Sequence, residues 1–434
     1  MNVFRQHPTL EFLPLEKQRE VQALRLSRHV ALCARRSPYY RTLFKQNGID
    51  AASLTMDTLT GLPPTDKTAF AEHNDEFLAV QPSKVVDIVL SSGTTGKPTR
   101  VMYTERDLQR LAHNEELSFA SCGLTAADIA LLTCTMDRCF IAGLAYFLGI
   151  RALGAAAIRN GHGTLTGHTD IIASLRPTVI VGVPSFLRKL GRHLAEHGMD
   201  PASSSVRKLV CIGEPVRDRH MNLLPLGRDL ETIWKASVHS TYASSECITS
   251  FCECTACRGG HLHPDLAIVE ILDDDNRPLP PGRVGEIVLT PLAIQGMPLI
   301  RFKTGDVGFL LTEPCACGRL SPRLGPILGR KQQMMKVRGT SLYPQAVFAV
   351  LDDIPGLGEY YLDVQSHDNL SDELTLHLGD RPGRPSVEHV QERLQAGLRV
   401  RLAIVVDPEE RLRQHVFSPE SRKPVRFVDR RQRP

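Results

Sequence analysis

The chain has 434 residues, 42% of them hydrophobic and 23% charged, which is typical of a soluble globular protein long enough for two or more domains. Its formal net charge of +4 is too small for a general binder of polyanions, so we expect no nucleic-acid partner. The best membrane candidate, residues 139–150, is shorter than the ~20 residues of a spanning helix. Because no basic segment followed by an apolar run marks a signal peptide either, we expect a cytoplasmic protein without a membrane partner.

The sequence SSGTTGKP, residues 91–98, is the first informative stretch. Apolar and β-branched residues predict a strand before it, at residues 85–90, and a second strand after it, at residues 99–104. The next helix is expected to begin after Thr104, an N-cap residue with Asp107 at N3. A nucleotide-binding P-loop has four residues between its glycines and leads directly into a helix, so the ordinary P-loop is excluded.

The composition of this loop still suits phosphate. Its glycines let backbone N–H groups turn inward, its four hydroxyl side chains donate hydrogen bonds, and its lysine adds a positive charge. The candidate phosphate-binding residues are Ser91, Ser92, Gly93, Thr94, Thr95, Gly96 and Lys97. A flexible hairpin turn is the alternative, since runs of Ser, Gly and Thr are common in loops.

The remaining elements predict two domains. Apolar strands at residues 178–183, 208–213, 269–272 and 285–290 mix with amphipathic helices such as residues 184–197, which indicates an α/β fold with helices packed on mixed or parallel sheets. After Arg330 the pattern becomes helix, strand, strand, helix, strand. We therefore expect a large domain at residues 1–329 and a small α+β domain at residues 330–434.

Cysteines and histidines form a second constellation. The spacings Cys254-x-x-Cys257 and Cys315-x-Cys317 supply four thiolates, the ligand set of a closed structural zinc site. The nearby His261 and His263 could each replace one thiolate. The alternative is a group of buried cysteines without a ligand, but the polar, turn-rich sequence around them argues against it, and clusters in a chain without an export signal favour metal over disulfides.

The loop SSGTTGKP resembles the phosphate loop of the adenylate-forming enzymes, which join a carboxylic acid to AMP from ATP. Further motifs resemble those of the family and follow in its order. They give Gly213-Glu214-Pro215 on the adenine side, Tyr242, Ser245 and Glu246 in TYASSE, Asp306 in TGD, Arg330 and Gly339 in a G-R pattern, and Lys423 as the adenylation lysine. Such an ordered set is highly specific.

The branch of the family can be narrowed. Residues 35–50 and 59–70 resemble the N-terminal region of phenylacetate–coenzyme A ligases, as do the sequences GRLSPRLGPILGR and RGTSLYP. Two departures stand out, because Ala243 replaces the glycine of the family's Y-G and Lys331-Gln332-Gln333 replaces a Ser-Asp-Asp that includes the hinge aspartate. The second leaves the detail of lid movement open, because hinge residues need only absorb a backbone rotation.

The resemblance implies a two-step reaction in which an acyl-adenylate forms from ATP and the acyl group passes to coenzyme A. It assigns Mg²⁺ to Glu246, the ribose to Asp306, and the acyl and phosphate oxygens to Lys423 on a mobile C-terminal lid. It also favours a zinc site made by Cys254, a histidine, Cys315 and Cys317, whereas spacing alone favours the two thiolate pairs.

Substrate and partners are less sharply indicated. Residues 136–157 match the region that lines the acyl pocket in relatives, and Phe140, Tyr146 and Phe147 would suit an aromatic acid or equally a buried helix. A carrier-protein thiol or an amine remains an alternative acceptor, a homodimer remains open, and a zinc-binding module without catalysis is the alternative from another class.

Overall fold

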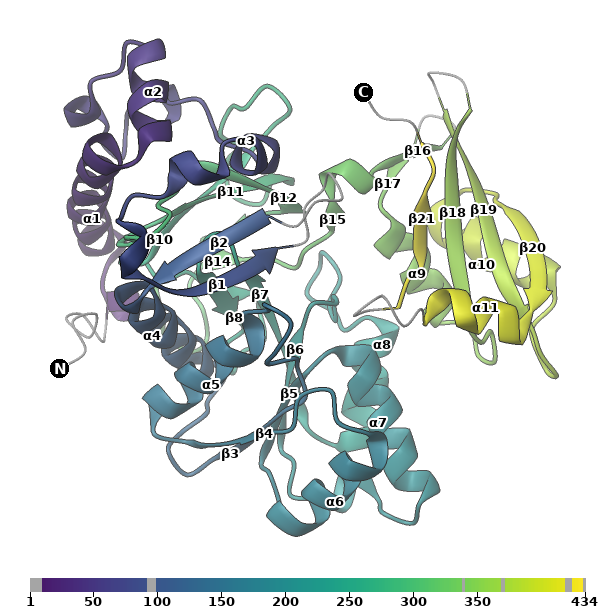
Figure 1. Ribbon diagram of the computed structural model, residues 1–434. Coiled ribbons are helices and arrows are strands. Elements are labelled where there is room, and N and C mark those ends of the chain that lie inside the picture. The colour runs from purple at the N-terminus through teal and green to yellow at the C-terminus, as the bar shows by residue number, and fades with distance from the viewer. Residues whose placement is uncertain (1–9, 92–98, 338–339, 368–370, 418–423, 432–434) are drawn as a thin grey trace. The chain divides into compact units, whose positions relative to one another are not determined.

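The computed structural model describes residues 10–91, 99–337, 340–367, 371–417 and 424–431. The chain divides into two compact units, Met1–Ile327 and Leu328–Pro434 (Figure 1). This division lies two residues before the domain boundary expected from the sequence. Among the described residues, no helix has the length and apolarity to cross a membrane.

The first unit contains a mostly parallel six-stranded sheet with strand order β4-β3-β5-β6-β7-β8. All neighbours in it pair in parallel except β7 and β8. The strands are β3 (Ile129–Leu132), β4 (Ala156–Arg159), β5 (Val179–Gly182), β6 (Lys208–Ile212), β7 (Ser237–Ser244) and β8 (Thr249–Cys252). The helices around it are α4 (Glu105–Ser121), α5 (Ala142–Leu153), α6 (Leu165–Leu175), α7 (Pro184–Glu196) and α8 (Pro225–Trp234).

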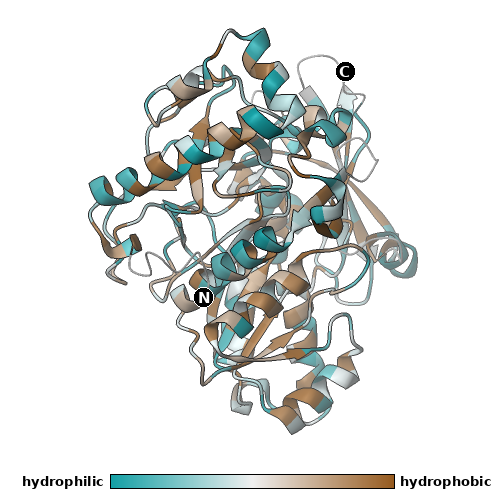
Figure 2. Ribbon diagram, turned by 60° about the vertical axis from the view of Figure 1, so that its left-hand side comes forward, coloured by the Kyte–Doolittle hydropathy of each residue, from teal (hydrophilic) through white to brown (hydrophobic). Residues whose placement is uncertain are grey.

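Helices cover both faces of this sheet because its strands are apolar on both sides. Leu132 packs in one buried cluster with Tyr146 and Ile150 of α5, while its neighbour Leu131 packs in another with Leu187 of α7. Successive strand residues point to opposite faces. The strands accordingly carry mostly hydrophobic residues, while the helices carry both hydrophobic and hydrophilic ones (Figure 2).

Antiparallel pairing dominates the rest of the first unit. Strands β10 (Ala267–Leu272), β11 (Gly285–Pro291) and β12 (Phe302–Gly308) form consecutive antiparallel pairs, and β1 (Val85–Ser91) pairs with β2 (Thr99–Thr104). Three short strands, β9 (Gly260–His261), β13 (Leu310–Leu311) and β14 (Arg323–Leu324), form a small sheet. The N-terminal helices are α1 (Leu15–Arg36), α2 (Pro38–Gln46) and α3 (Lys67–Glu72). The predicted mixture of parallel and other sheets in an α/β fold is confirmed.

The second unit is a small α+β domain with its own apolar core. Its main sheet has the order β20-β19-β18-β21. The elements are β15 (Gly329–Arg330), β16 (Met335–Val337), β17 (Thr340–Leu342), α9 (Pro344–Asp352), β18 (Tyr360–His367), β19 (Ser371–Asp380), α10 (Val387–Leu398), β20 (Ala403–Pro408), α11 (Glu409–Val416) and β21 (Phe427–Asp429). The helix, strand, strand, helix, strand pattern expected from the sequence corresponds to α9, β18, β19, α10 and β20.

Candidate active site

The predicted phosphate loop lies between two paired strands. Ser91 ends β1 and stands opposite Thr99, the first residue of β2, so the expected order of strand, loop and strand is confirmed. Ser92, Gly93, Thr94, Thr95, Gly96 and Lys97 lie outside the described residues. Beyond β2, Thr104 caps α4 through a reciprocal capping box with Asp107, as the sequence predicts.

Tyr242 and Asp306 come together from different sheets. The phenol of Tyr242, on β7, donates a 2.9 Å hydrogen bond to Oδ2 of Asp306, on β12. Burial and the Asp306 charge raise the pKa of the Tyr242 phenol well above its usual value, so it remains a neutral donor. Gly305, with φ +75°, precedes Asp306, and a side chain would be strained in this left-handed conformation. The carboxylate is therefore held in one orientation.

Glu246 lies in the turn between β7 and β8 and is only 8% exposed. Ser244 Oγ donates a 3.2 Å hydrogen bond to its Oε2, and Lys67 Nζ lies 3.9 Å from its Oε1. The Tyr103 hydroxyl donates to the carbonyl of the adjacent Ser245 at 2.9 Å. An oriented carboxylate at this position offers the hard oxygen ligand that Mg²⁺ prefers.

Lys67 was not assigned a site role from the sequence. It is the first residue of α3, which begins after the N-cap Asp66, and its segment served in the sequence only as a marker of the family branch. Lys67 and Glu246 are 179 residues apart in the sequence, the difference between positions 246 and 67. No local pattern distinguishes a lysine that contacts such a distant carboxylate from a lysine on a solvated surface.

Arg110 is a second residue that sequence reasoning missed. Its guanidinium is buried on α4 and donates to the carbonyls of Ile248, Leu266 and Leu292. Burial lowers its pKa to about 10, so it remains charged at neutral pH. Because Ile248 lies two residues after Glu246, Arg110 anchors the turn that carries this carboxylate.

The Glu214 carboxylate forms hydrogen bonds that connect β6 to the start of α7. Gly213 follows β6 with φ +75°, and the Glu214 carboxylate accepts 2.9 Å hydrogen bonds from both the backbone N–H and the hydroxyl of Ser185. Ser185 belongs to the first turn of α7, whose free N–H groups favour a carboxylate. The Gly213-Glu214-Pro215 segment is thereby fixed at the carboxyl end of β6.

The cysteine–histidine cluster gathers donor atoms from distant segments. Atoms of Cys254, His261, Cys315 and Cys317 all lie within 4.8 Å of one another. The sulfurs of Cys254 and Cys315 are 3.5 Å apart, and Cys317 Sγ lies 3.3 Å from His261 Nε2. Cys257 is not in this group, because its sulfur contacts His239 Nδ1 at 3.6 Å. The spacing of the cysteines favoured Cys257 as the fourth ligand, whereas the structure groups His261 with Cys254, Cys315 and Cys317.

These four residues fit zinc. A tetrahedral ion with Zn–S near ~2.3 Å and Zn–N near ~2.0 Å sets its ligands about 3.6–3.8 Å apart, close to the separations observed. Burial lowers the pKa of His261 to about 4, so its imidazole is neutral. The Nδ1 atom of His261 contacts the carbonyl and hydroxyl of Ser321, which directs Nε2 toward the sulfurs with its lone pair available.

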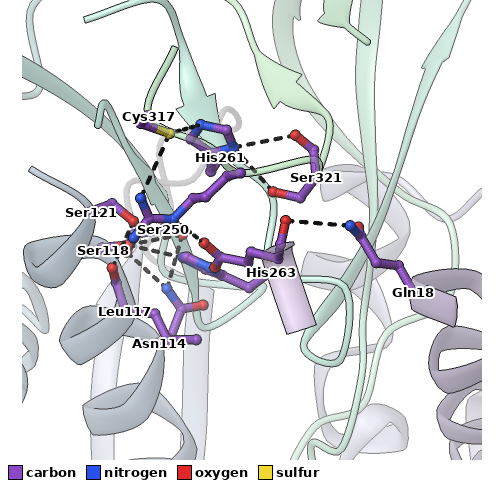
Figure 3. A network of polar contacts seen from close by, with 12 residues as sticks. Gln18, Asn114, Leu117, Ser118, Ser121, Ser250, His261, His263, Cys317 and Ser321 are labelled. Atoms are coloured by element: carbon purple, nitrogen blue, oxygen red, sulfur yellow. Dashed lines mark hydrogen bonds and ion pairs between the residues drawn. The ribbon is translucent and has the colours of Figure 1, made fainter. Parts of the chain in front are cut away.

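A buried polar network continues from this cluster (Figure 3). Arg319 Nη1 donates to Cys317 Sγ at 3.7 Å, and Arg319 Nε donates to Glu11 at 2.6 Å. Glu11 also contacts His263 Nδ1, and His263 Nε2 lies 3.2 Å from Ser118 Oγ on α4. His263 thus lies beside the cluster as a network residue, which distinguishes it from His261.

Comparison with known proteins shows the family of this chain. Residues 19–292 match the family of AMP-binding enzymes. The chain belongs to this family. It is 35% identical over 375 residues to a phenylacetate–coenzyme A ligase of Thermus thermophilus, covering 85% of this chain and 83% of the relative. It is 25% identical over 394 residues to the phenylacetate–coenzyme A ligase of Escherichia coli, covering 88% of this chain and 87% of the relative.

Two solved structures share the fold of this chain. A 2-hydroxyisobutyryl-CoA ligase in its postadenylation state aligns with a TM-score of 0.85 at 21% identity, over 97% of this chain and 91% of the other. ATP-bound MatB from Rhodopseudomonas palustris aligns with a TM-score of 0.58 at 18% identity, over 81% of this chain and 68% of the other.

The other predicted site residues of this AMP-binding enzyme are less closely described. Arg330 is an exposed residue of β15 in the second unit, and Gly339 and Lys423 lie outside the described residues. In the predicted acyl region, Tyr146 is a core residue of α5 that packs edge-to-face on Phe119 at 5.9 Å. The partly buried Phe147 carries the Arg159 guanidinium 5.1 Å from its ring centre. The buried-helix interpretation therefore holds for Tyr146.

Proposed function

We propose that this protein is an AMP-forming acid–coenzyme A ligase for an aryl or arylacetic acid. The observation that carries the proposal is the hydrogen bond by which Tyr242 on β7 orients the Asp306 carboxylate on β12, together with the buried Glu246 carboxylate in the turn that follows β7. The two-step activity is that of the phenylacetate–coenzyme A ligases it resembles; the assignments to individual residues and the class of acid are our proposals.

In the first step a carboxylate oxygen of the acid attacks the α-phosphorus of ATP, and pyrophosphate leaves with the electron pair of the broken P–O bond. Both reactants are anions, so the site must offset charge and align the attack. Residues 91–97 hold the phosphates, Asp306 accepts hydrogen bonds from the ribose hydroxyls, and Arg330 contacts the ribose–phosphate region. Gly213, Glu214, Pro215, Tyr242 and Ser245 form the adenine side.

Glu246 would hold the Mg²⁺ ion, which offsets phosphate charge when bound. Lys67 lies beside Glu246 and adds a second positive charge near the same carboxylate. Lys423, on the C-terminal domain, contacts the acyl and phosphate oxygens during the attack. In the second step the thiol sulfur of coenzyme A attacks the acyl carbon, the thiol loses its proton, and AMP leaves to give the thioester.

Cys254, His261, Cys315 and Cys317 would hold a structural zinc ion. Three thiolates and one imidazole are the ligand set of a closed structural site, so zinc bound there would stabilise the segments that carry these residues. Elemental analysis of the purified protein should find about one zinc per chain. Full stability of a Cys315→Ser, Cys317→Ser variant together with no detectable zinc in the unmodified protein would contradict this assignment.

A pyrophosphate-release assay with ATP and a panel of acids tests the activity. We expect release that depends on the acid, and a coenzyme A thioester detected by mass spectrometry when coenzyme A is added. Acid-dependent release without a thioester would indicate the alternative acceptors, a carrier-protein thiol or an amine. Absence of release with every acid would contradict the proposal.

A further inference from the structure

Glu115 is a buried carboxyl group in the middle of α4 that the mechanism above does not use. Its residue is 2% exposed. Burial raises the pKa of the Glu115 carboxyl to about 7, opposed only by a hydrogen bond with Ser250. In the described part of the chain, no Lys, Arg or His contributes to this shift. A buried acidic group without a cation is costly, so its presence calls for a role.

The fold brings α5 close to this carboxyl group. Gly149 of α5 faces Glu115, and a Cβ atom added at Gly149 would lie 2.2 Å from the Cβ of Glu115. No larger residue fits there without displacing α4. Helix α5 lies within residues 136–157, the segment that resembles the acyl-lining region of the family, so Glu115 packs directly against the helix expected to border the acid.

Glu115 is electrostatically coupled to a residue near the carboxyl ends of the parallel strands. Burial, and to a smaller extent the Glu115 charge, raise the pKa of the Cys134 thiol, which lies two residues after the carboxyl end of β3. The Gly213-Glu214-Pro215 segment leaves the carboxyl end of β6, a strand of the same parallel sheet. Ligands of open α/β sheets bind outside these carboxyl ends.

Ser250 links Glu115 to the catalytic turn. It lies on β8 four residues after Glu246, a span of at most about 13 Å for an extended chain. Its side chain is buried and lies 3.1 Å from Ser118 Oγ, while Asn114 Nδ2 donates to its Oγ at 3.0 Å (Figure 3). Across the sheet, Ser250 of β8 pairs with Ala243 of β7, and Ala243 is exposed. Glu115, Asn114, Ser118 and Ser250 therefore form one buried group of hydrogen-bonding side chains beside the strand that follows the Glu246 turn.

We propose that Glu115, with Ser250, recognises a hydrogen-bond donor on the acid, a hydroxyl or amino group at the end remote from the reacting carboxylate. This inference rests on the proposed function and narrows its substrate class to hydroxy- or amino-substituted aryl acids. A carboxyl group accepts such a bond in a dry site, and an acid without the donor would leave it unpaired. Sites built to bind a substrate hydroxyl reject the analogue without it strongly.

The test compares 4-hydroxyphenylacetate, 3-hydroxyphenylacetate and 4-aminophenylacetate with phenylacetate and 4-methylphenylacetate, where methyl matches the size of the hydroxyl group without donating. For the unmodified enzyme we expect kcat/KM, from pyrophosphate release and thioester formation, to favour a hydroxy or amino acid over its methyl analogue by roughly 10²-fold. Glu115→Leu should abolish or reverse the preference, and Glu115→Gln, which keeps an oxygen acceptor, should retain part of it. Glu116→Gln, on the same helix but paired with His113, is the matched control and should keep the full preference.

Two results would overturn the inference while leaving the proposed function intact: turnover by the unmodified enzyme without preference for a donor group, or the same preference in the Glu115 variants. If Glu115→Leu does not fold, the inference is tested by comparing the kcat/KM preference for a donor group in the isosteric Glu115→Gln variant with that of the unmodified enzyme. Lack of ATP-dependent turnover with every acid in the unmodified enzyme would overturn the proposed function itself.

Discussion

Asp306 has its orientation set before any nucleotide binds. The Tyr242 phenol donates to one oxygen of its carboxylate, and the Asp306 backbone N–H donates to Thr304 Oγ1 at 3.1 Å. A carboxylate held in this way can accept ribose hydroxyl bonds without first losing rotational freedom. Individual charge-assisted bonds of this kind contribute roughly 1.5–3 kcal/mol.

We expect Asp306→Ala to remove most ATP-dependent activity while the fold is retained, because two such bonds to the ribose are lost. Tyr242→Phe should weaken ATP binding less, since the carboxylate remains but is less firmly oriented. ATP affinity by calorimetry and pyrophosphate release measure both effects. Asp57→Asn, at a side chain 83% exposed in a surface ion pair, is the control, and unchanged ATP affinity in Asp306→Ala would exclude the ribose assignment.

Arg319 shows a different use of charge. In the proposed zinc site, three thiolates, one neutral imidazole and Zn²⁺ would carry a net charge of −1. Arg319 donates to one of these sulfurs, and Glu11 holds its guanidinium. We expect Arg319→Gln to weaken zinc binding by about 10- to 100-fold, as is usual when such an outer partner is lost. Glu11→Gln should act in the same direction with a smaller effect.

Competition with a chromophoric chelator measures this change in zinc affinity. The exposed Arg283 provides the control variant Arg283→Gln. A melting temperature lowered in Arg319→Gln with unaltered zinc affinity would assign Arg319 to packing alone.

Helix α4 illustrates how an element predicted from local sequence gains roles from its neighbours. Its capping box was expected, but the Asp107 carboxylate also accepts hydrogen bonds from the backbone of Gln295 and Gly296. Arg110 ties the same helix to the Glu246 turn, and Ser118 ties it to His263. The helix therefore positions parts of the site that lie far away in the sequence.

Helix α1 carries a pH-sensitive contact. His29 is 3% exposed and its Nε2 lies 3.0 Å from the Leu299 carbonyl, and burial lowers its pKa from 6.5 to about 4. Between pH 6.5 and about pH 4, His29 therefore binds a proton in the unfolded chain but not in the folded chain. Stability from this group is complete above pH 6.5 and falls toward pH 4, by at most about 3 kcal/mol.

Denaturant titrations from pH 7.5 to pH 4.5 should show this loss for the first unit. His29→Gln should lower stability at pH 7.5 and flatten its decline, because the variant has no imidazole to protonate. His197→Gln, at an exposed histidine of the same unit, should leave the slope as it is. An equal slope in His29→Gln would mean that other groups dominate the acid sensitivity.

At the scale of the whole molecule, the candidate catalytic residues are divided between two compact units. Glu246 and Asp306 belong to the first, while Arg330 and the predicted Lys423 belong to the second. Each unit has its own apolar core. We expect this division to serve two half-reactions, with Lys423 at the site in only one of them.

Lys423→Ala should slow adenylate formation by about 10²-fold or more, the effect of a lost transition-state contact. Thioester formation from a chemically supplied acyl-adenylate should be slowed much less. Rapid-quench measurement of each half-reaction separates the two effects. Equal losses in both would assign Lys423 a structural role, and near-normal adenylation would direct attention to Lys336.

The family, the fold class and most of the elements around the site could be predicted from the sequence alone. Residues 85–90, 99–104 and the cap at Thr104 were recognisable because strand composition and helix capping are local properties. The order of the motifs was equally readable, since it depends only on the sequence. Family membership and fold class are confirmed; the roles of the individual motif residues remain predictions.

Which side chains meet across the fold could not be predicted from local sequence patterns. Spacing favoured Cys257 as a metal ligand, but the chain turns so that this sulfur contacts His239 and His261 joins the other three cysteines. Glu11 reaches Arg319 across 308 positions of sequence, and Lys67, Arg110 and Glu115 acquire their neighbours in the same way. The reason is physical: periodicity and capping record contacts within a few residues, whereas the packing of sheets and helices sets contacts between distant segments, which no local pattern encodes.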